Sequence, residues 1–152
     1  AISHINLELA GIFSGDISLG ELKAKSGSEF VNYLGVLNRS EIAKLLQRVK
    51  IGMVTLLPTQ SYVESLPIKM FEYMLSGIPV IASNFPLWQE IVAKYDCGVL
   101  VNPEDFAEIA KAAQELLTNE DRAREMGING RNAVLEHFNW ENEQQKLINF
   151  YK

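Results

Sequence analysis

Residues 51–57, Ile-Gly-Met-Val-Thr-Leu-Leu, form an apolar run that ends at Pro58. A run of this kind is typical of a strand buried on both faces, and such strands belong to parallel sheets. A second short apolar run, Pro-Val-Ile-Ala-Ser, occupies residues 79–83, and the pattern predicts a helix over 67–76 between the two. Because parallel strands need a crossover connection, usually a helix, residues 51–83 are read as strand, helix and strand.

The alternation of strands and helices continues on both sides of this stretch. Further strands are predicted at 5–13, 30–35 and 98–101, and further helices at 41–50, 86–94, 105–118, 120–138 and 140–151. Ser40 is expected to cap the 41–50 helix, and Gly77 to end the 67–76 helix. The pattern predicts an α/β fold, doubly wound around a largely parallel sheet. In such sheets ligands bind beyond the carboxyl ends of the strands, so the loops after those strands are where function is expected.

Composition excludes several classes of protein. The 152 residues carry 14 Lys and Arg against 19 Asp and Glu, a formal net charge of −5, and 47% of them are hydrophobic. That apolar content excludes a disordered chain, and no run approaches the roughly 20 residues that span a bilayer. The acidic balance argues against a nucleic-acid partner. The single cysteine, Cys97, indicates a reducing compartment, and the two histidines show no metal-ligand spacing, so no metal is expected.

The start of the 67–76 helix is the first candidate site. Pro67 suits the first helical position and pushes Leu66 away from helical geometry, so Leu66 is expected to be the N-cap. A leucine side chain cannot accept a hydrogen bond from the helix. The amides of Ile68, Lys69 and Met70 therefore need an outside partner, and an anion would satisfy them.

The polar residues of this helix lie on one stripe. Lys69, Glu72 and Ser76 are spaced i, i+3 and i+7, and Ser65 continues the stripe one turn earlier. A carboxylate such as Glu72 can accept two hydrogen bonds and suits a vicinal diol such as that of ribose. Lys69 suits a phosphate as a point charge. The alternative is an ordinary surface ion pair between Lys69 and Glu72.

These residues resemble a known family. Glu64 and Glu72 are separated by seven residues and are followed by Gly-Ile-Pro-Val-Ile-Ala-Ser at 77–83. The arrangement resembles the E-x7-E signature of retaining glycosyltransferases of the GT-B fold, specifically the family-4 group. Similar stretches occur at 31–35, 40–46, 98–105 and 138–140, and Pro58 matches a strand-end proline. The resemblance covers nearly the whole chain.

The resemblance implies two Rossmann-like domains, of which the C-terminal one holds a nucleoside diphosphate sugar. Residues 1–152 would then be a single, partial nucleotide-sugar-binding domain that lacks its first strand–helix unit and the N-terminal acceptor domain. The fragment alone is expected to be inactive. The full-length enzyme would move a sugar, with retention and without a metal or other cofactor, to a glycan or lipid-linked acceptor in polysaccharide biosynthesis. The family also implies a cytoplasmic location at the inner face of the membrane, with peripheral association through the missing domain.

The resemblance also implies roles for individual side chains. Glu72 would hold the ribose hydroxyls, and Glu64 would lie near the sugar and the reacting centre as the catalytic candidate. Lys69 would face the phosphate or the sugar, although many members have proline there. Ser65 and Pro67 stand where the family often has glycines, and Pro67 removes one amide donor.

Backbone groups complete the set that the resemblance implies. Backbone amides at Ser65, Leu66 and Ile68 would meet the pyrophosphate or the sugar. The nucleotide base would lie near Gly35 and Val36, at the end of the 30–35 strand.

Two other functions remain open from sequence. One keeps the nucleotide site but changes the reaction to that of a GT-B-like epimerase or phosphorylase. The other is a non-enzymatic α/β interaction module resembling flavodoxin or a response regulator, although the acidic cluster of a receiver domain is missing. Trp88 and Trp140 are expected to pack in the core or between helices rather than to stack on a sugar.

Overall fold

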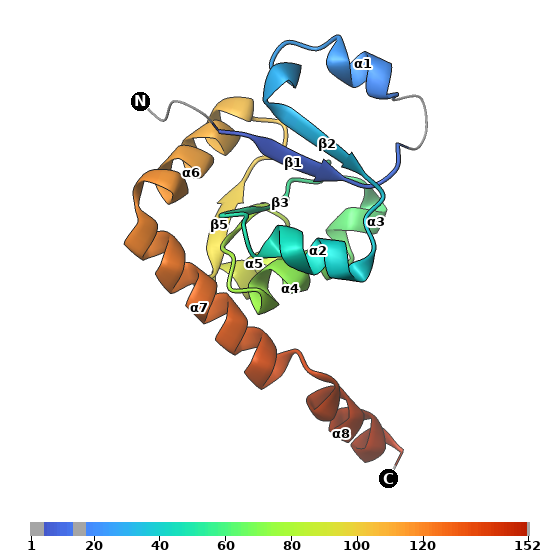
Figure 1. Ribbon diagram of the computed structural model, residues 1–152. Coiled ribbons are helices and arrows are strands. Elements are labelled where there is room, and N and C mark those ends of the chain that lie inside the picture. Colours follow the sequence, from blue (N-terminus) through green and yellow to red (C-terminus); the bar gives the residue numbers. More distant parts are fainter. Residues whose placement is uncertain (1–4, 14–17, 152) are drawn as a thin grey trace. The chain divides into compact units, whose positions relative to one another are not determined.

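The computed structural model describes residues 5–13 and 18–151 (Figure 1). The chain divides into two compact units, Ala1–Leu45 and Leu46–Lys152. In the first unit, β1 (Leu7–Ala10) and β2 (Val31–Gly35) pair in parallel. Between them lie α1 (Leu19–Lys23) and a 3-10 turn, η1 (Ser28–Phe30). The two strands predicted at 5–13 and 30–35 are confirmed, and the first is shorter than predicted.

The helix α2 (Arg39–Leu46) begins and ends earlier than the sequence predicted. Asn38, not Ser40, caps it, because its Oδ1 accepts from the Glu41 amide at 3.0 Å. The Glu41 carboxylate in turn accepts from the Asn38 amide at 2.7 Å, which completes a reciprocal capping box. The prediction of Ser40 was wrong because the Asn38–Glu41 pair satisfies two amides at once, and Ser40 is left inside the first turn.

The second unit holds a three-stranded parallel sheet and six helices among the described residues. The sheet has the order β3-β4-β5 and consists of β3 (Gly52–Val54), β4 (Val80–Ser83) and β5 (Gly98–Val101). The helices are α3 (Gln60–Val63), α4 (Ile68–Leu75), α5 (Pro86–Val92), α6 (Phe106–Thr118), α7 (Glu120–His137) and α8 (Trp140–Phe150). All strand pairs run parallel, which confirms the α/β fold class, and β3 is shorter than the predicted 51–57 strand.

The central strand β4 is buried on both faces, as its apolar sequence predicted. Val80 and Ala82 belong to a core cluster shared with α4, α5 and α7. Ile81, between them, belongs to a second cluster shared with α6. Successive side chains of a strand point to opposite faces, so helices cover both faces of this sheet.

Helices α4 and α7 pack closely because glycines meet where they cross. Gly77 ends α4 with a φ of +73°, and the Ile78 amide donates to the Tyr73 carbonyl at 3.0 Å in a Schellman motif. A Cβ on Gly127 of α7 would lie 2.1 Å from the Gly77 carbonyl oxygen. On the same helix, the Arg131 guanidinium donates to the Leu75 carbonyl at 2.8 Å. The position of α4 is therefore set from its C-terminal end by α7.

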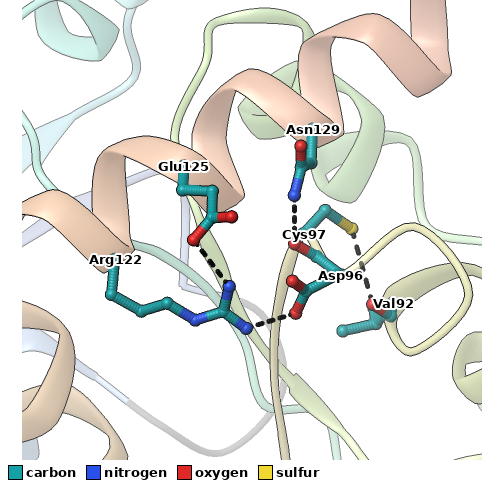
Figure 2. A network of polar contacts seen from close by, with 6 residues as sticks. All are labelled: Val92, Asp96, Cys97, Arg122, Glu125 and Asn129. Atoms are coloured by element: carbon teal, nitrogen blue, oxygen red, sulfur yellow. Dashed lines mark hydrogen bonds and ion pairs between the residues drawn. The ribbon is translucent and has the colours of Figure 1, made fainter.

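A polar network joins α7 to the turn before β5 (Figure 2). Asp96 has a positive φ of 49°, and its carboxylate pairs with the Arg122 guanidinium at 2.5 Å. Arg122 also pairs with Glu125, and the Asn129 side chain donates to the Asp96 carbonyl at 3.2 Å. Asp96 tolerates the left-handed conformation better than most residues, so this turn is held by both its backbone and its partners.

The C-terminal helix α8 has no buried residue, and Trp140 at its start is 68% exposed. The expectation that Trp140 packs in the core or between helices is therefore wrong, whereas Trp88 is fully buried as expected. Within residues 5–13 and 18–151, no helix is both long and apolar enough to cross a membrane.

Candidate functional site

The 56–65 segment leads from the end of β3 toward α4 and carries the short helix α3. Hydrogen bonds from side chains of β4 and α5 hold it at both ends. The buried Ser83 hydroxyl donates to the Leu56 carbonyl at 2.7 Å. The indole N–H of Trp88 donates to the Ser65 carbonyl, also at 2.7 Å. The segment that carries Glu64 is thus fixed against the sheet and α5.

Helix α4 begins one residue later than the sequence predicted. Pro67 is the N-cap, with an extended backbone of φ −76° and ψ 127°, and the expectation of Leu66 was wrong. Proline fits this place because its fixed φ is compatible with extended backbone. The Met70 amide donates to the Pro67 carbonyl at 3.0 Å, which satisfies one of the three amides predicted to need a partner. Among the described residues, the amides of Ile68 and Lys69 have no acceptor.

Lys69 is a half-buried cation in the first turn of α4. Burial lowers the pKa of its ammonium group below the usual 10.5. None of the ion pairs among the described residues includes Lys69. A cation that is partly removed from water without a partner raises the affinity of this helix end for an anion, and the two free amides point to the same end.

Glu72 is exposed on α4, one turn after Lys69. In the described part of the chain no ion pair joins the two side chains, so the alternative of a Lys69–Glu72 surface pair is not supported. The pKa of the neighbouring Tyr73 is raised, first by burial and then by the charge of Glu72. The Ser76 hydroxyl is engaged with the Glu72 carbonyl at 2.8 Å. The carboxylate of Glu72 is therefore open to solvent and available to a ligand.

Glu64 is exposed and is the C-cap residue of α3. The Gln60 side-chain amide donates to its carboxylate at 3.4 Å, a long contact. Leu66 and Ile68 are exposed apolar residues on either side of Pro67, with exposed fractions of 39% and 76%. The structure thus brings the predicted residues of 64–72 together on one continuous stretch at the start of α4.

The predicted base-binding residues belong to the first unit. Gly35 ends β2 with a φ of +68°, and the following Val36 is 71% exposed. The Gly35 carbonyl accepts from the Gly11 amide at 2.8 Å. Within the part of the chain that the structure describes, no cluster of three or more His, Cys, Asp or Glu side chains could hold a metal ion.

Sequence reasoning missed the residues that hold the 56–65 segment. Trp88 was expected to pack in the core, which it does, but its hydrogen bond to the Ser65 carbonyl was not foreseen. Ser83 was placed at the end of a predicted strand and of the 77–83 stretch that carries the resemblance, and no hydrogen bond was expected of it. A buried indole N–H or hydroxyl usually has a partner, but the sequence does not show which one, because both acceptors lie more than twenty residues away.

A family model described as "Glycosyl transferases group 1" matches residues 4–133. Among curated proteins, an MMP alpha-(1->4)-mannosyltransferase from Mycolicibacterium hassiacum is 28% identical over 126 residues, 82% of this chain. A GDP-mannose-dependent alpha-(1-6)-phosphatidylinositol monomannoside mannosyltransferase from Mycobacterium tuberculosis is 36% identical over 90 residues, 59% of the chain. The chain spans only 29% and 23% of the lengths of these two relatives.

Solved structures of similar fold cover almost the whole chain. A sucrose-phosphate synthase from Thermosynechococcus elongatus matches 96% of this chain and 37% of its own, with a TM-score of 0.80 and 27% identity. Anabaena Alr3699/HepE in complex with UDP matches 97% of this chain and 41% of its own, with a TM-score of 0.80 and 21% identity. At 21% identity, this second likeness shows the fold alone.

Proposed function

This chain belongs to the group 1 glycosyl transferases, and we propose that it forms the donor-binding part of an enzyme that moves a sugar from a nucleoside diphosphate sugar. The observation that carries the proposal is the start of α4. There, Lys69 is half-buried and has no ion-pair partner among the described residues, and the amides of Ile68 and Lys69 have no acceptor among them. The exposed carboxylate of Glu72 follows one turn later. Family membership gives no support to the flavodoxin-like or response-regulator-like interaction module.

The chemistry of each group suits one part of a nucleotide sugar. Lys69 and the amides of Ile68 and Lys69 are donors for diphosphate oxygens. The carboxylate of Glu72 can accept a hydrogen bond from each of the two hydroxyls of the ribose. Glu64, which precedes Ser65 and Leu66 in the connection to α4, is proposed to lie near the sugar and the reacting centre. Gly35 and Val36 of the first unit are proposed to meet the base.

The proposed reaction breaks the bond between the anomeric carbon and the diphosphate oxygen. A new bond to an acceptor hydroxyl forms on the same face of the sugar, so that configuration is retained, and the hydroxyl proton passes to the departing diphosphate. Negative charge grows on that diphosphate as the bond breaks. Donors already fixed in place stabilise this charge without reorganising, and such preorganised stabilisation commonly contributes more to catalysis than any other effect. The proposal requires no metal ion or other cofactor.

The acceptor is proposed to be a glycan or a lipid-linked sugar, bound by a domain outside residues 1–152. The support for a further domain is that the chain spans 29% of the mannosyltransferase from Mycolicibacterium hassiacum and 37% of the sucrose-phosphate synthase; the acceptor class rests on the family resemblance alone. We therefore expect this chain to bind donor without transferring sugar. Retention, the family-4 assignment and the E-x7-E roles of Glu64 and Glu72 belong to the same proposal, as does a cytoplasmic enzyme acting at the inner face of the membrane.

Calorimetric titration with UDP, GDP, ADP and CDP tests the donor site. We expect saturable binding of one nucleotide. Glu72→Gln should weaken that binding by about tenfold or more, because hydrogen bonds to a charged group contribute about 1.5–3 kcal/mol.

The matched control is Glu115→Gln, which changes an exposed glutamate on α6 whose carboxylate, among the described residues, forms only a 3.9 Å contact with Lys111. Its affinity should equal that of the unchanged chain. The proposal is wrong if neither this chain nor one extended to the length of the relatives binds any of the four nucleotides.

A further inference from the structure

Two side-chain hydrogen bonds hold the 56–65 segment, and both come from donors more than twenty residues away in sequence. Ser83, at the end of β4, donates to the Leu56 carbonyl at 2.7 Å and makes a longer contact of 3.4 Å with the Val54 carbonyl. Trp88, on α5, donates to the Ser65 carbonyl at 2.7 Å. One bond lies near the start of the segment and the other at its end.

Both donors are rigid. Trp88 is fully buried, and its ring packs against that of Phe85 with centroids 4.7 Å apart. Ser83 is also fully buried, within the central strand. A buried side chain in a packed core cannot follow a loop that moves. The two carbonyls are therefore held at fixed points of the sheet and of α5.

The position of Glu64 depends on the bond from Trp88, because Glu64 directly precedes Ser65, whose carbonyl accepts that bond. Within the segment itself, the Glu64 amide donates to the Gln60 carbonyl at 3.1 Å, which holds the Glu64 backbone to α3. The Ser65 amide makes a long contact of 3.4 Å with the Tyr62 carbonyl, and the Glu64 carboxylate makes a 3.4 Å contact with Gln60. The contacts within the segment tie Glu64 to α3, whereas the short bond from Trp88 ties this end of the segment to α5.

We propose that Trp88 is a positioning residue for donor binding, which it supports by holding the Ser65 carbonyl and so fixing Glu64 relative to the start of α4. Ser83 has the same role at the other end of the segment through the Leu56 carbonyl. This inference rests on the proposed function. Neither side chain touches the donor, and each acts through a backbone carbonyl of the segment.

Trp88→Phe removes the N–H donor and keeps an aromatic ring in the core, and Ser83→Ala removes the hydroxyl. The control is Val92→Ala, a truncation of a core residue on the same helix α5 that is 1% exposed. Nucleotide affinity is measured by calorimetry, and backbone amide hydrogen exchange is followed over residues 60–66.

We expect Trp88→Phe to weaken nucleotide binding roughly fivefold, the effect of one net hydrogen bond, and to speed amide exchange at 60–66. Ser83→Ala should change both in the same direction, and it decides the matter if Trp88→Phe does not fold. Val92→Ala should lower the thermal midpoint while leaving affinity and exchange at 60–66 unchanged. A role in stability alone would instead make all three variants behave alike.

The outcomes separate this inference from the function on which it rests. If the unchanged chain binds nucleotide and both Trp88→Phe and Ser83→Ala bind it equally well, the positioning role is overturned and the proposed function stands. If neither the unchanged chain nor an extended one binds nucleotide, the proposed function is overturned, and the positioning role falls with it.

Discussion

Lys69 is a half-buried cation for which the described residues provide no ion-pair partner. Burial lowers its pKa, so the folded chain holds this proton less tightly than the unfolded chain does. At neutral pH the charged form is therefore unfavourable to folding. That penalty is relieved as the pH rises from the lowered pKa toward the usual 10.5. A residue that costs stability and has no ion-pair partner among the described residues is better explained by a ligand than by packing.

Lys69→Met tests this role for the lysine. The variant should be at least as stable as the unchanged chain at neutral pH, because it removes a half-buried charge and keeps an apolar chain of similar length. Its stability advantage in urea denaturation should shrink as the pH is raised from neutral toward 10.5, since only the unchanged chain gains from losing the proton. Nucleotide binding should weaken by about tenfold, the effect of one charge-assisted hydrogen bond.

The control for Lys69 is Lys111→Met, at an exposed lysine of α6. It should leave affinity unchanged. A clear loss of stability in Lys69→Met at neutral pH, with affinity unaffected, would show that this lysine serves the fold instead.

Cys97, unlike the half-buried Lys69, is fully buried and packs in the hydrophobic core. Burial is the main cause that raises the pKa of its thiol to about 11, and the charge of Asp96 adds to the effect. Very little thiolate is present at mildly alkaline pH, and the thiolate is the reactive form. Alkylation by iodoacetamide under those conditions should therefore proceed only as fast as the chain opens, and it should become rapid in urea. Rapid alkylation of the folded chain would mean that the turn before β5 is open.

At the scale of elements, the contact between α4 and α7 determines where the candidate site lies. Gly127→Ala would place a Cβ 2.1 Å from the Gly77 carbonyl oxygen, closer than real contacts allow. Helix propensity alone would favour alanine by about 1 kcal/mol. We expect the steric cost to dominate and to lower the free energy of unfolding by about 1–3 kcal/mol.

Gly20→Ala in α1 is the comparison, because its Cβ would meet only the Ser18 hydroxyl at 3.7 Å. That substitution should be neutral or slightly stabilising in urea denaturation. If Gly127→Ala stabilises the chain as much as Gly20→Ala does, the close packing of α4 on α7 is incorrect.

The elements that could be predicted are those whose signals are local. β4 and β5 were found with almost their observed bounds, because apolar runs next to proline or glycine mark buried strands. The end of α4 was found because Gly77 supplies the positive φ of a Schellman motif. The N-caps of α2 and α4 were missed, because several neighbouring residues can each serve as the cap. At α2, the Asn38 side chain and not that of Ser40 accepts the hydrogen bond from the helix. At α4, Pro67 and not Leu66 has the extended backbone of the cap residue.

In the candidate site, too, local features could be predicted from the sequence and non-local ones could not. Its residues at 64–72 could be named from spacing and resemblance, because they are contiguous in sequence. The bonds from Ser83 and Trp88 could not be foreseen, because they join residues 27 and 23 positions apart and depend on how β4 and α5 pack. The half-burial of Lys69 likewise follows from tertiary packing and not from the helix itself.

At the scale of the whole molecule, the residues assigned to the donor divide between the two units. Gly35 and Val36 belong to Ala1–Leu45, whereas residues 64–72 belong to Leu46–Lys152. The base contact at Gly35 and Val36 and the diphosphate contact at the start of α4 are therefore two separate proposals, each tested within its own unit. Inorganic diphosphate should affect the second unit, at the start of α4.

The most direct measurement follows the backbone amide resonances of a ¹⁵N-labelled chain as the nucleotide that binds in calorimetry is added. We expect the largest shifts at the amides of Ile68 and Lys69, with smaller shifts at Gly35 and Val36. In Glu72→Gln the same shifts should appear only at higher nucleotide concentration. Saturating binding that leaves the amides of Ile68 and Lys69 unmoved would contradict the claim that the start of α4 holds the diphosphate.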